Sequence, residues 1–307
     1  MLQILHDTNV PFMKYRRVAY LFSSACVLAT ALWLVVHHGP RLSVDFTGGT
    51  LIDVGVSQAM QVDEIRKAAD AAGFRGAEIQ TAGEVNKEFY VRLGAQQGAE
   101  TFPRLKQTIE AAHPGVIAES RGQTAVGPKV GSELARRAVW AILLSILGIL
   151  VYVGIRYEFK FALGAVIALF HDVFIVFGIL CFAGREINLT SVAALLTLAG
   201  YSMNDTIVVF DRIRERMRTL SKETHDRAFD IALNETLSRT IITSFTVFLT
   251  SLSLYIFGGE VINDFALAMV AGVVFGTYSS IYVASALALE MWNWTDRRKR
   301  PVRARAA

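Results

Sequence analysis

The feature that most constrains this chain is the gathering of its apolar residues into long uninterrupted runs. The sequence is 53% hydrophobic and only 19% charged, whereas soluble domains carry about 25% charged residues. A membrane-spanning helix needs about 20 consecutive, mainly apolar residues, and about six runs approach that length. The expected spans cover residues 18–36, 139–155, 161–183, 190–210, 240–257 and 265–291. The sequence therefore predicts a polytopic α-helical membrane protein.

Basic residues flank these spans and predict their orientation, because loops rich in Lys and Arg stay in the cytoplasm. We expect a cytoplasmic N-terminal segment (1–17), a first transmembrane helix (18–36) and a periplasmic domain (37–136). Transmembrane helices two to six (137–294) and a basic cytoplasmic tail (295–307) follow. The net charge of +4 is explained by these flanking residues, so no nucleic acid is expected as a partner. The first run lacks a small-x-small cleavage site, which favours a retained anchor.

The polar region between the first two spans has its own alternation of elements. Residues 42–56 read as a strand broken at Gly48 and Gly49, residues 62–72 and 102–112 as amphipathic helices, and 116–125 as extended chain. Residues 77–81 and 88–93 suggest a hairpin around 83–86. The order β-α-β-β-α-β predicts a small α+β ferredoxin-like domain. Its Cys-free sequence has no paired acids or metal-spaced ligands, so we expect it to contact another protein, with no cofactor and no metal.

Ionisable groups inside the spans are functional candidates, because each costs at least a few kcal/mol in lipid. Asp205 lies in the fourth span, and Tyr201 shares its helix face four residues earlier. The carboxyl must be protonated, paired or hydrated. The alternative is a structural hydrogen bond that holds two helices together.

A polar stripe marks the fifth span. It is headed by Arg239, a natural counter-charge for Asp205, and its residues recur at intervals of three and four. They are Arg239, Thr243, Thr246, Thr250 and Ser253. The stripe favours a hydrated path or a helix interface, although each hydroxyl could instead bond its own backbone.

Two further features lie in the third and sixth spans. His171 and Asp172 are adjacent, so they point about 100° apart on a helix. Asp172 is a candidate for proton coupling, whereas His171 reads more readily as a packing residue. The sixth span carries a ridge of small residues four apart, which allows close approach of another helix: Ala268, Gly272, Gly276, Ser280 and Ala284.

Six short motifs follow one another along the chain: VDFTGGT (44–50), VGPKVG (126–131), HD (171–172), GYSMND (200–205), DRIRE (211–215) and SRTIITS (238–244). In this order they resemble the motifs of the SecD/SecF family of protein-export subunits, within the resistance-nodulation-division (RND) superfamily. The likeness extends from the first span to the last. SecD members have a much larger external region, so the modest polar domain favours the SecF branch.

The resemblance implies a six-span half of an RND-type unit that pairs with SecD. It also implies association with the SecYEG channel and YajC, translocating preprotein chains as the cargo, and use of the proton motive force rather than a cofactor or an enzymatic reaction. Family proton-pathway residues carry over to Asp205 and Arg239, with Asn204, Tyr201, Asp172 and Thr243 as further candidates.

Alternative classes remain open at this point. A passive scaffold or insertion factor for the Sec channel would need no titrating acid and would tolerate Asp205→Asn. An intramembrane aspartyl protease could use Asp172, Asp205 or Asp211, but its expected Gly-x-Gly-Asp motif is missing. A small-molecule efflux pump of the same superfamily usually carries both halves in one chain.

Overall fold

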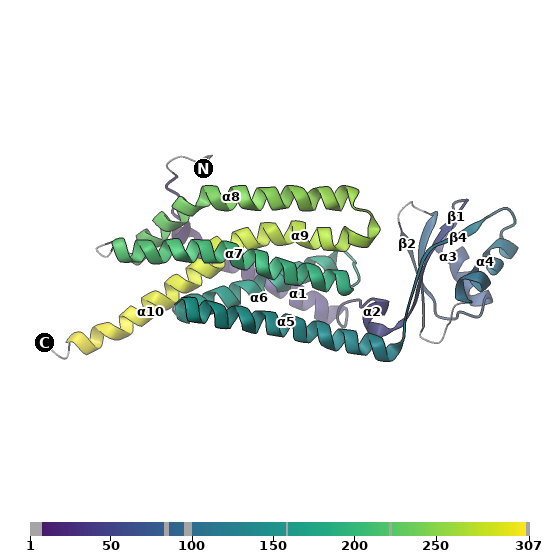
Figure 1. The fold of residues 1–307 in the computed structure, drawn as a ribbon, viewed down its shortest axis with the longest axis horizontal. Coiled ribbons are helices and arrows are strands. Elements are labelled where there is room, and N and C mark those ends of the chain that lie inside the picture. The colour runs from purple at the N-terminus through teal and green to yellow at the C-terminus, as the bar shows by residue number, and fades with distance from the viewer. Residues whose placement is uncertain (1–7, 83–85, 95–99, 158, 221–222, 305–307) are drawn as a thin grey trace. The chain divides into compact units, whose positions relative to one another are not determined.

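The computed structural model describes residues 8–82, 86–94, 100–157, 159–220 and 223–304. The chain forms two compact units, one built from Met1–Arg41 and Ala141–Ala307 and the other from Leu42–Trp140 (Figure 1). Most of the expected hairpin loop (83–85) and the last three residues of the expected basic tail lie outside the described residues.

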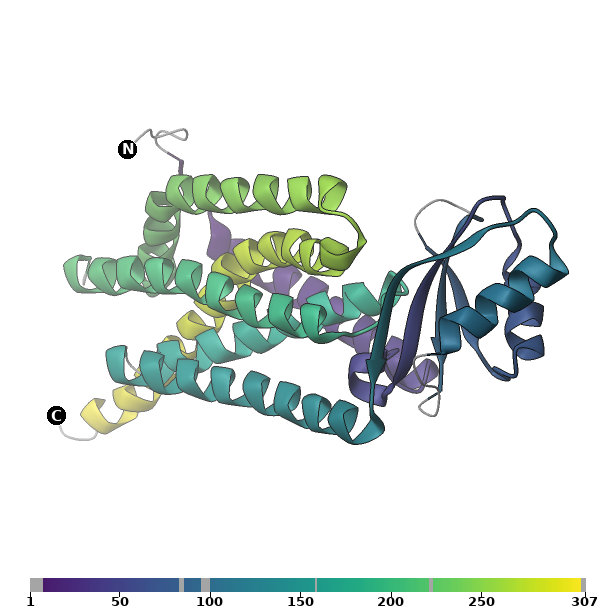
Figure 2. The same cartoon turned by 45° about the vertical axis from the view of Figure 1, so that its right-hand side comes forward.

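The centre of the smaller unit is a four-stranded antiparallel sheet that two helices cover. Its strands lie in the order β2-β3-β1-β4, and α3 and α4 cover one face (Figure 2). The elements are β1 (Gly49–Val56), α3 (Val62–Ala71), β2 (Glu78–Ala82), β3 (Glu88–Leu93), α4 (Thr101–Ala112) and β4 (Ala118–Val126). This order and connectivity confirm the predicted ferredoxin-like domain.

The core of this unit follows from the two periodicities of its sequence. Alternate residues of the central strands point to the helix-covered face, so Ile52 pairs with Val91 in register and both are fully buried. Ile65 of α3, with Leu105 and Ile109 of α4, closes the core from the other side. The predicted apolar faces of both helices are thereby confirmed.

The prediction of a strand over residues 42–56 was wrong for the first part of that range. Residues Val44–Thr47 form a short helical turn, α2, with Ser43 at its N-cap accepting a hydrogen bond from the Asp45 amide. Gly48 and Gly49 then take φ angles of +73° and +127°, which side-chain-bearing residues rarely adopt. A Cβ on Gly49 would lie 2.6 Å from the Leu93 carbonyl oxygen. The two glycines thus let the chain turn from a capped helix directly into β1.

The larger unit is a bundle of long helices. A short 3₁₀ turn (Phe12–Tyr15) leads into the first helix, and the last two helices are joined by a π-helical turn, Ser280–Ala284. The helices are α1 (Arg16–Val36), α5 (Pro128–Arg156, which begins in the smaller unit), α6 (Phe159–Phe182), α7 (Leu189–Thr219), α8 (His225–Phe257), α9 (Glu260–Ser279) and α10 (Ser285–Ala304). Among the described residues, six helical stretches are long and apolar enough to cross a membrane, which confirms the predicted number.

Several helices extend beyond the predicted spans. Helix α5 begins at Pro128 rather than near 139, and α8 begins at His225 rather than near 240. An apolar run marks only the part of a helix that lipid can surround, whereas the backbone hydrogen bonds continue through polar residues. The sixth predicted span proved to be α9, the π turn and α10 in succession.

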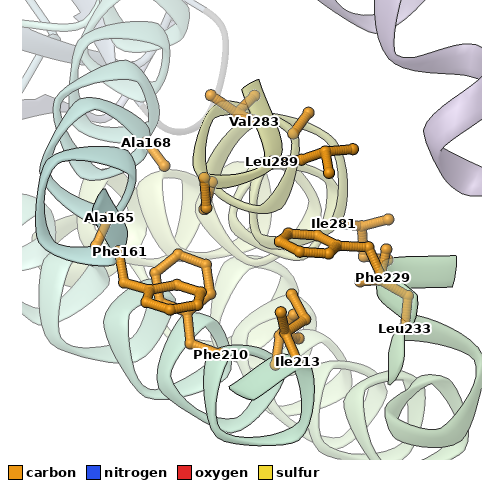
Figure 3. Packing of buried hydrophobic residues seen from close by; sticks show 14 of the residues in the cluster. Phe161, Ala165, Ala168, Phe210, Ile213, Phe229, Leu233, Ile281, Val283 and Leu289 are labelled. Atoms are coloured by element: carbon orange, nitrogen blue, oxygen red, sulfur yellow. The ribbon is translucent and has the colours of Figure 1, made fainter. Parts of the chain in front are cut away.

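Close packing holds α6, α7 and α8 around the last span. The rings of Phe161 and Phe210 meet with centroids 4.8 Å apart, and Phe229 lies in the same apolar cluster (Figure 3). Gly272 faces α7, where a Cβ would lie 2.5 Å from a Leu198 methyl carbon. The small-residue ridge is therefore a packing surface, as expected.

Candidate functional site

Asp205 lies on α7 and is buried, with 7% of its surface exposed. Its Oδ1 accepts a hydrogen bond of 2.9 Å from the Thr240 hydroxyl on α8. Its Oδ2 accepts one of 2.6 Å from the Ser280 hydroxyl at the start of the π turn. One carboxyl thus joins three segments, and the shorter distance is typical of a hydroxyl bonded to a carboxylate.

Asp172 forms a second buried carboxyl site on α6. It is fully buried, and its Oδ2 accepts hydrogen bonds from Ser202 of α7 at 2.5 Å and from Ser279 of α9 at 2.6 Å. Its Oδ1 lies 2.9 Å from Nδ1 of the neighbouring His171. This contact gives His171 a polar role that sequence reasoning had not assigned to it.

The two carboxyl sites meet adjacent residues of the last span. Ser279 faces Asp172 and Ser280 faces Asp205, because consecutive helical residues point to different neighbours. The buried carboxyls of α6 and α7 therefore bond two consecutive serines, at the point where α9 passes into the π turn.

The predicted stripe on α8 has local hydrogen bonds. The hydroxyls of Thr243, Thr246 and Thr250 donate to carbonyl oxygens of their own helix at 2.8–3.0 Å, and all three residues are exposed on this unit. These bonds match the alternative weighed for the stripe. The polar residues that α8 does bury are Thr236, Thr240, Ser244 and Ser251.

The other predicted residues lie around Asp205 without bonding it. Arg239 is exposed, and no ion pair with Asp205 occurs among the described residues. Because Thr240 points at the carboxyl, its neighbour Arg239 projects about 100° away. Asn204 is likewise exposed, and Tyr201 is half-buried.

Sequence reasoning missed the hydroxyl partners of both carboxyls. Thr240 belongs to a run of hydroxyl residues four apart with Thr236 and Ser244, and this run could have been recognised beside the stripe. Ser280 was assigned only to packing, and Ser202 was quoted only within a motif. A single Ser in a membrane helix usually bonds its own backbone, so the sequence contains no signal that singles these residues out.

The hydroxyl partners fit either charge state of the two buried carboxyls. A hydroxyl can both donate and accept a hydrogen bond, so it can satisfy a carboxylate and equally a protonated carboxyl. No group of three His, Cys, Asp or Glu residues that could hold a metal ion occurs in the part of the chain that the structure describes.

Two family models match the chain. The model described as "Protein export membrane protein SecD/SecF, C-terminal" matches residues 106–294, and the "SecD/SecF GG Motif" matches residues 33–60. The second match contains Gly48 and Gly49, whose φ angles and close contacts only glycine allows.

Similar proteins span nearly the whole chain. The protein translocase subunit SecF of Thermodesulfovibrio yellowstonii is 42% identical and covers 94% of this chain and 97% of its own. The SecF proteins of Vibrio alginolyticus and Escherichia coli O157:H7 are 43% and 42% identical, covering 95% and 94% of this chain and 93% and 90% of their own. These relatives are named as a transport component, in agreement with the expectation that the chain is not an enzyme.

Solved structures show the same architecture. The crystal structure of SecDF from Thermus thermophilus, described as a translocon-associated membrane protein, matches with a TM-score of 0.85 and 36% identity. The match covers 94% of this chain, which spans 39% of the solved chain. Six apolar helices, both family models and these relatives agree. The chain is therefore a multi-pass membrane protein that belongs to the SecF family of protein translocase subunits.

Proposed function

We propose that this chain pairs with SecD in the bacterial inner membrane and uses the proton motive force to promote preprotein translocation through the SecYEG channel, with YajC as an accessory partner. Its membership of the SecF family supports a role in protein export. The description of the similar SecDF as translocon-associated supports a place beside SecD and the translocation channel, whereas YajC is inferred from the family resemblance alone.

The observation that carries the proton-coupled part is the position of Asp205. Its carboxyl is buried in the helical unit and is held by hydroxyls from α8 and from the π turn. Moving one charge through 100 mV is worth about 2.3 kcal/mol. One proton passing through this site can therefore drive a modest rearrangement of helices.

Protonation of Asp205 changes which groups donate and which accept. The ionised carboxyl accepts from Thr240 and Ser280, whereas the protonated carboxyl must itself donate one hydrogen bond. Ser280 has a second acceptor available, because its Oγ lies 3.0 Å from the carbonyl oxygen of Thr277. When the serine proton turns to that carbonyl, the Ser280 oxygen accepts a hydrogen bond from the protonated carboxyl instead. This neutral bond is weaker than the charge-assisted one, so the tie between α7 and the π turn loosens and the helices can shift.

The exposed polar residues complete the proposed path. Arg239 and Thr243 of α8 and Asn204 of α7 face outward from this unit, where polar groups are costly against lipid. We assign them to the face that meets SecD, with Arg239 attracting the ionised form of Asp205. Tyr201 and Asp172 lie inward as further members of the path.

The orientation follows from the basic flanks of the spans. Both termini lie in the cytoplasm, and the ferredoxin-like unit lies in the periplasm, where it contacts the emerging preprotein. The unit has no catalytic motif in its sequence, which fits a role in contact and movement.

Asp205→Asn tests this function in inverted membrane vesicles that carry the chain with SecD. The parent should stimulate preprotein translocation in a manner that an uncoupler abolishes. Asn cannot exchange a proton, so the variant should lose this uncoupler-sensitive component and fall to the level of vesicles without the chain. Asp70→Asn, an acid-to-amide change at an exposed position in the smaller unit, is the matched control.

The opposite result would favour the scaffold function. If Asp205→Asn assembles normally, translocates as well as the parent and stays equally sensitive to the uncoupler, Asp205 is not in the proton path. Equal loss in Asp70→Asn would show that the assay responds to assembly rather than to protons.

A further inference from the structure

The last membrane span carries two adjacent serines that bond two different buried acids. Ser279 donates to Oδ2 of Asp172 on α6, and Ser280 donates to Oδ2 of Asp205 on α7, both at 2.6 Å. Both serines are fully buried. The carboxyls lie on separate helices, yet one peptide bond joins the two residues that hold them.

Each serine has a second acceptor within its own helix. The Ser280 hydroxyl lies 3.0 Å from the carbonyl oxygen of Thr277, and the Ser279 hydroxyl lies 3.4 Å from that of Gly276. A hydroxyl has one proton to donate. Each serine can therefore direct its proton either to its carboxylate or to the backbone carbonyl. The charge of the carboxyl determines which acceptor is favoured.

The backbone changes its hydrogen-bond pattern at this point. The π turn begins at Ser280 and ends at Ala284, and the Ser285 hydroxyl donates to the Ser280 carbonyl at 2.7 Å. Single π turns within α-helices are rare, and those that occur often lie at functional sites. Here the turn starts at the residue that contacts Asp205, so a change at that contact acts on the least regular part of the span.

Few other charged or titratable groups act on the pair. His171 contacts Asp172 directly. Arg239 and Tyr201 lie within electrostatic range of Asp205. Neither acid pairs with a Lys or Arg side chain among the described residues, so the groups that respond to a change of charge are the hydroxyls and, at Asp172, also His171.

We propose that Ser279 and Ser280 couple the two buried acids, so that protonation of Asp205 changes the hydrogen bonding of Asp172 through the serine pair. The serines are positioning residues, and Asp172 becomes a second responding acid rather than an isolated structural one. When Asp205 takes up a proton, Ser280 turns its own proton to the Thr277 carbonyl and accepts a weaker, neutral hydrogen bond from the carboxyl, so the start of the π turn shifts. Ser279 moves with it and weakens its bond to Asp172. This inference rests on the proposed proton pathway, which it deepens.

Infrared difference spectra of the purified complex with SecD, recorded between acidic and alkaline pH in lipid nanodiscs, test the coupling directly. The carboxyl band that Asp172→Asn removes belongs to Asp172. Asp205→Asn should displace this band in the parent background. The displacement should vanish when Ser279→Ala and Ser280→Ala are both present, because the proposed link between the two acids is then missing. If the hydroxyls had only a structural role, the displacement would remain.

Ser251→Ala is the matched control, because Ser251 is also a buried serine, on α8, and lies in neither carboxyl site. This variant should leave the displacement intact. If the double serine variant does not fold, Ser280→Ala alone breaks the same link and is read in the same way. An Asp172 band that ignores Asp205→Asn in the parent overturns the proposal. So does a displacement that survives the loss of both hydroxyls, which would place the coupling in α7 through Ser202.

These spectra need neither preprotein nor a proton gradient. A displaced band with normal, uncoupler-sensitive translocation in Asp205→Asn would keep the coupling and reject the proposed motor. Loss of uncoupler-sensitive translocation without a displaced band would keep the motor and reject the coupling.

Discussion

At the scale of single residues, hydroxyl groups stabilise the buried acids of this chain. Asp205 and Asp172 are together contacted by Thr240, Ser280, Ser202 and Ser279, each from a helix other than that of the acid it bonds. A hydrogen bond to a charged group contributes about 1.5–3 kcal/mol. A hydroxyl can also accept a hydrogen bond from the protonated carboxyl, whereas a Lys or Arg side chain can only donate. The sites can therefore hold an acid in either charge state.

Thr240→Val tests this at one atom. The change keeps the shape of the side chain but removes the donor to Oδ1 of Asp205, so the complex should lose about 1–3 kcal/mol of stability and much of its uncoupler-sensitive translocation. Thermal unfolding and vesicle translocation measure the two effects. Thr236→Val is the control, since Thr236 is buried one turn away and donates to the Ala232 and Leu233 carbonyls of its own helix. Equal losses in both variants would contradict the assigned role of Thr240.

At the scale of elements, the join between α2 and β1 depends on backbone that only glycine provides. Gly48 follows the capped turn, and Gly49 is the first residue of β1, one of the two central strands of the sheet. A Cβ at Gly48 would lie 2.8 Å from Cα of Pro128, the first residue of α5. Both the turn and the start of α5 are thus packed against a position without a side chain.

Gly49→Ala should therefore destabilise the smaller unit. The left-handed φ costs about 1–3 kcal/mol for a residue with a side chain, and the contact with the Leu93 carbonyl adds to this cost. Limited proteolysis of the full chain should show faster cleavage within residues 42–140. Gly94→Ala is the control, because a Cβ there meets nothing within 4 Å and its φ is ordinary. Similar cleavage of the two variants would show that the Gly49 backbone adapts.

At the scale of the whole molecule, the helical unit exposes large apolar side chains whose contact with water would be unfavourable. Leu143, Leu144 and Leu147 of α5 are each more than half exposed, as expected for a face turned to lipid. The exposed faces of α7 and α8 also carry Asn204 and Arg239. Polar groups within spans usually face protein or a hydrated cavity, so we expect these two positions to meet SecD.

Photo-crosslinking distinguishes the two faces. A benzophenone amino acid at position 204 should form an adduct with SecD in membranes that contain both subunits. The same probe in place of Leu144 should give no protein adduct, because it faces lipid. Adducts of equal yield at both positions, or none at 204, would contradict the assignment of faces.

The sequence alone determined the elements and the class of protein. Apolar runs identified six spans because lipid accepts no unpaired backbone and few charges, and the two periodicities of the polar region predicted its sheet and both helices. The helix ends were less predictable, since polar extensions of α5 and α8 leave no apolar signal.

Tertiary structure decided which side chains meet. The sequence identified Asp205 and Asp172 through their cost in lipid, but their partners Ser279 and Ser280 lie far along the chain, in a span whose regular small-residue spacing indicated only packing. Spacing along one helix predicts which residues share a face. It cannot predict which face a neighbouring helix presents, because that depends on how helices α6, α7 and α8 pack around the last span. The serine pair at the π turn is therefore a product of packing, and it was visible only once the helices were assembled.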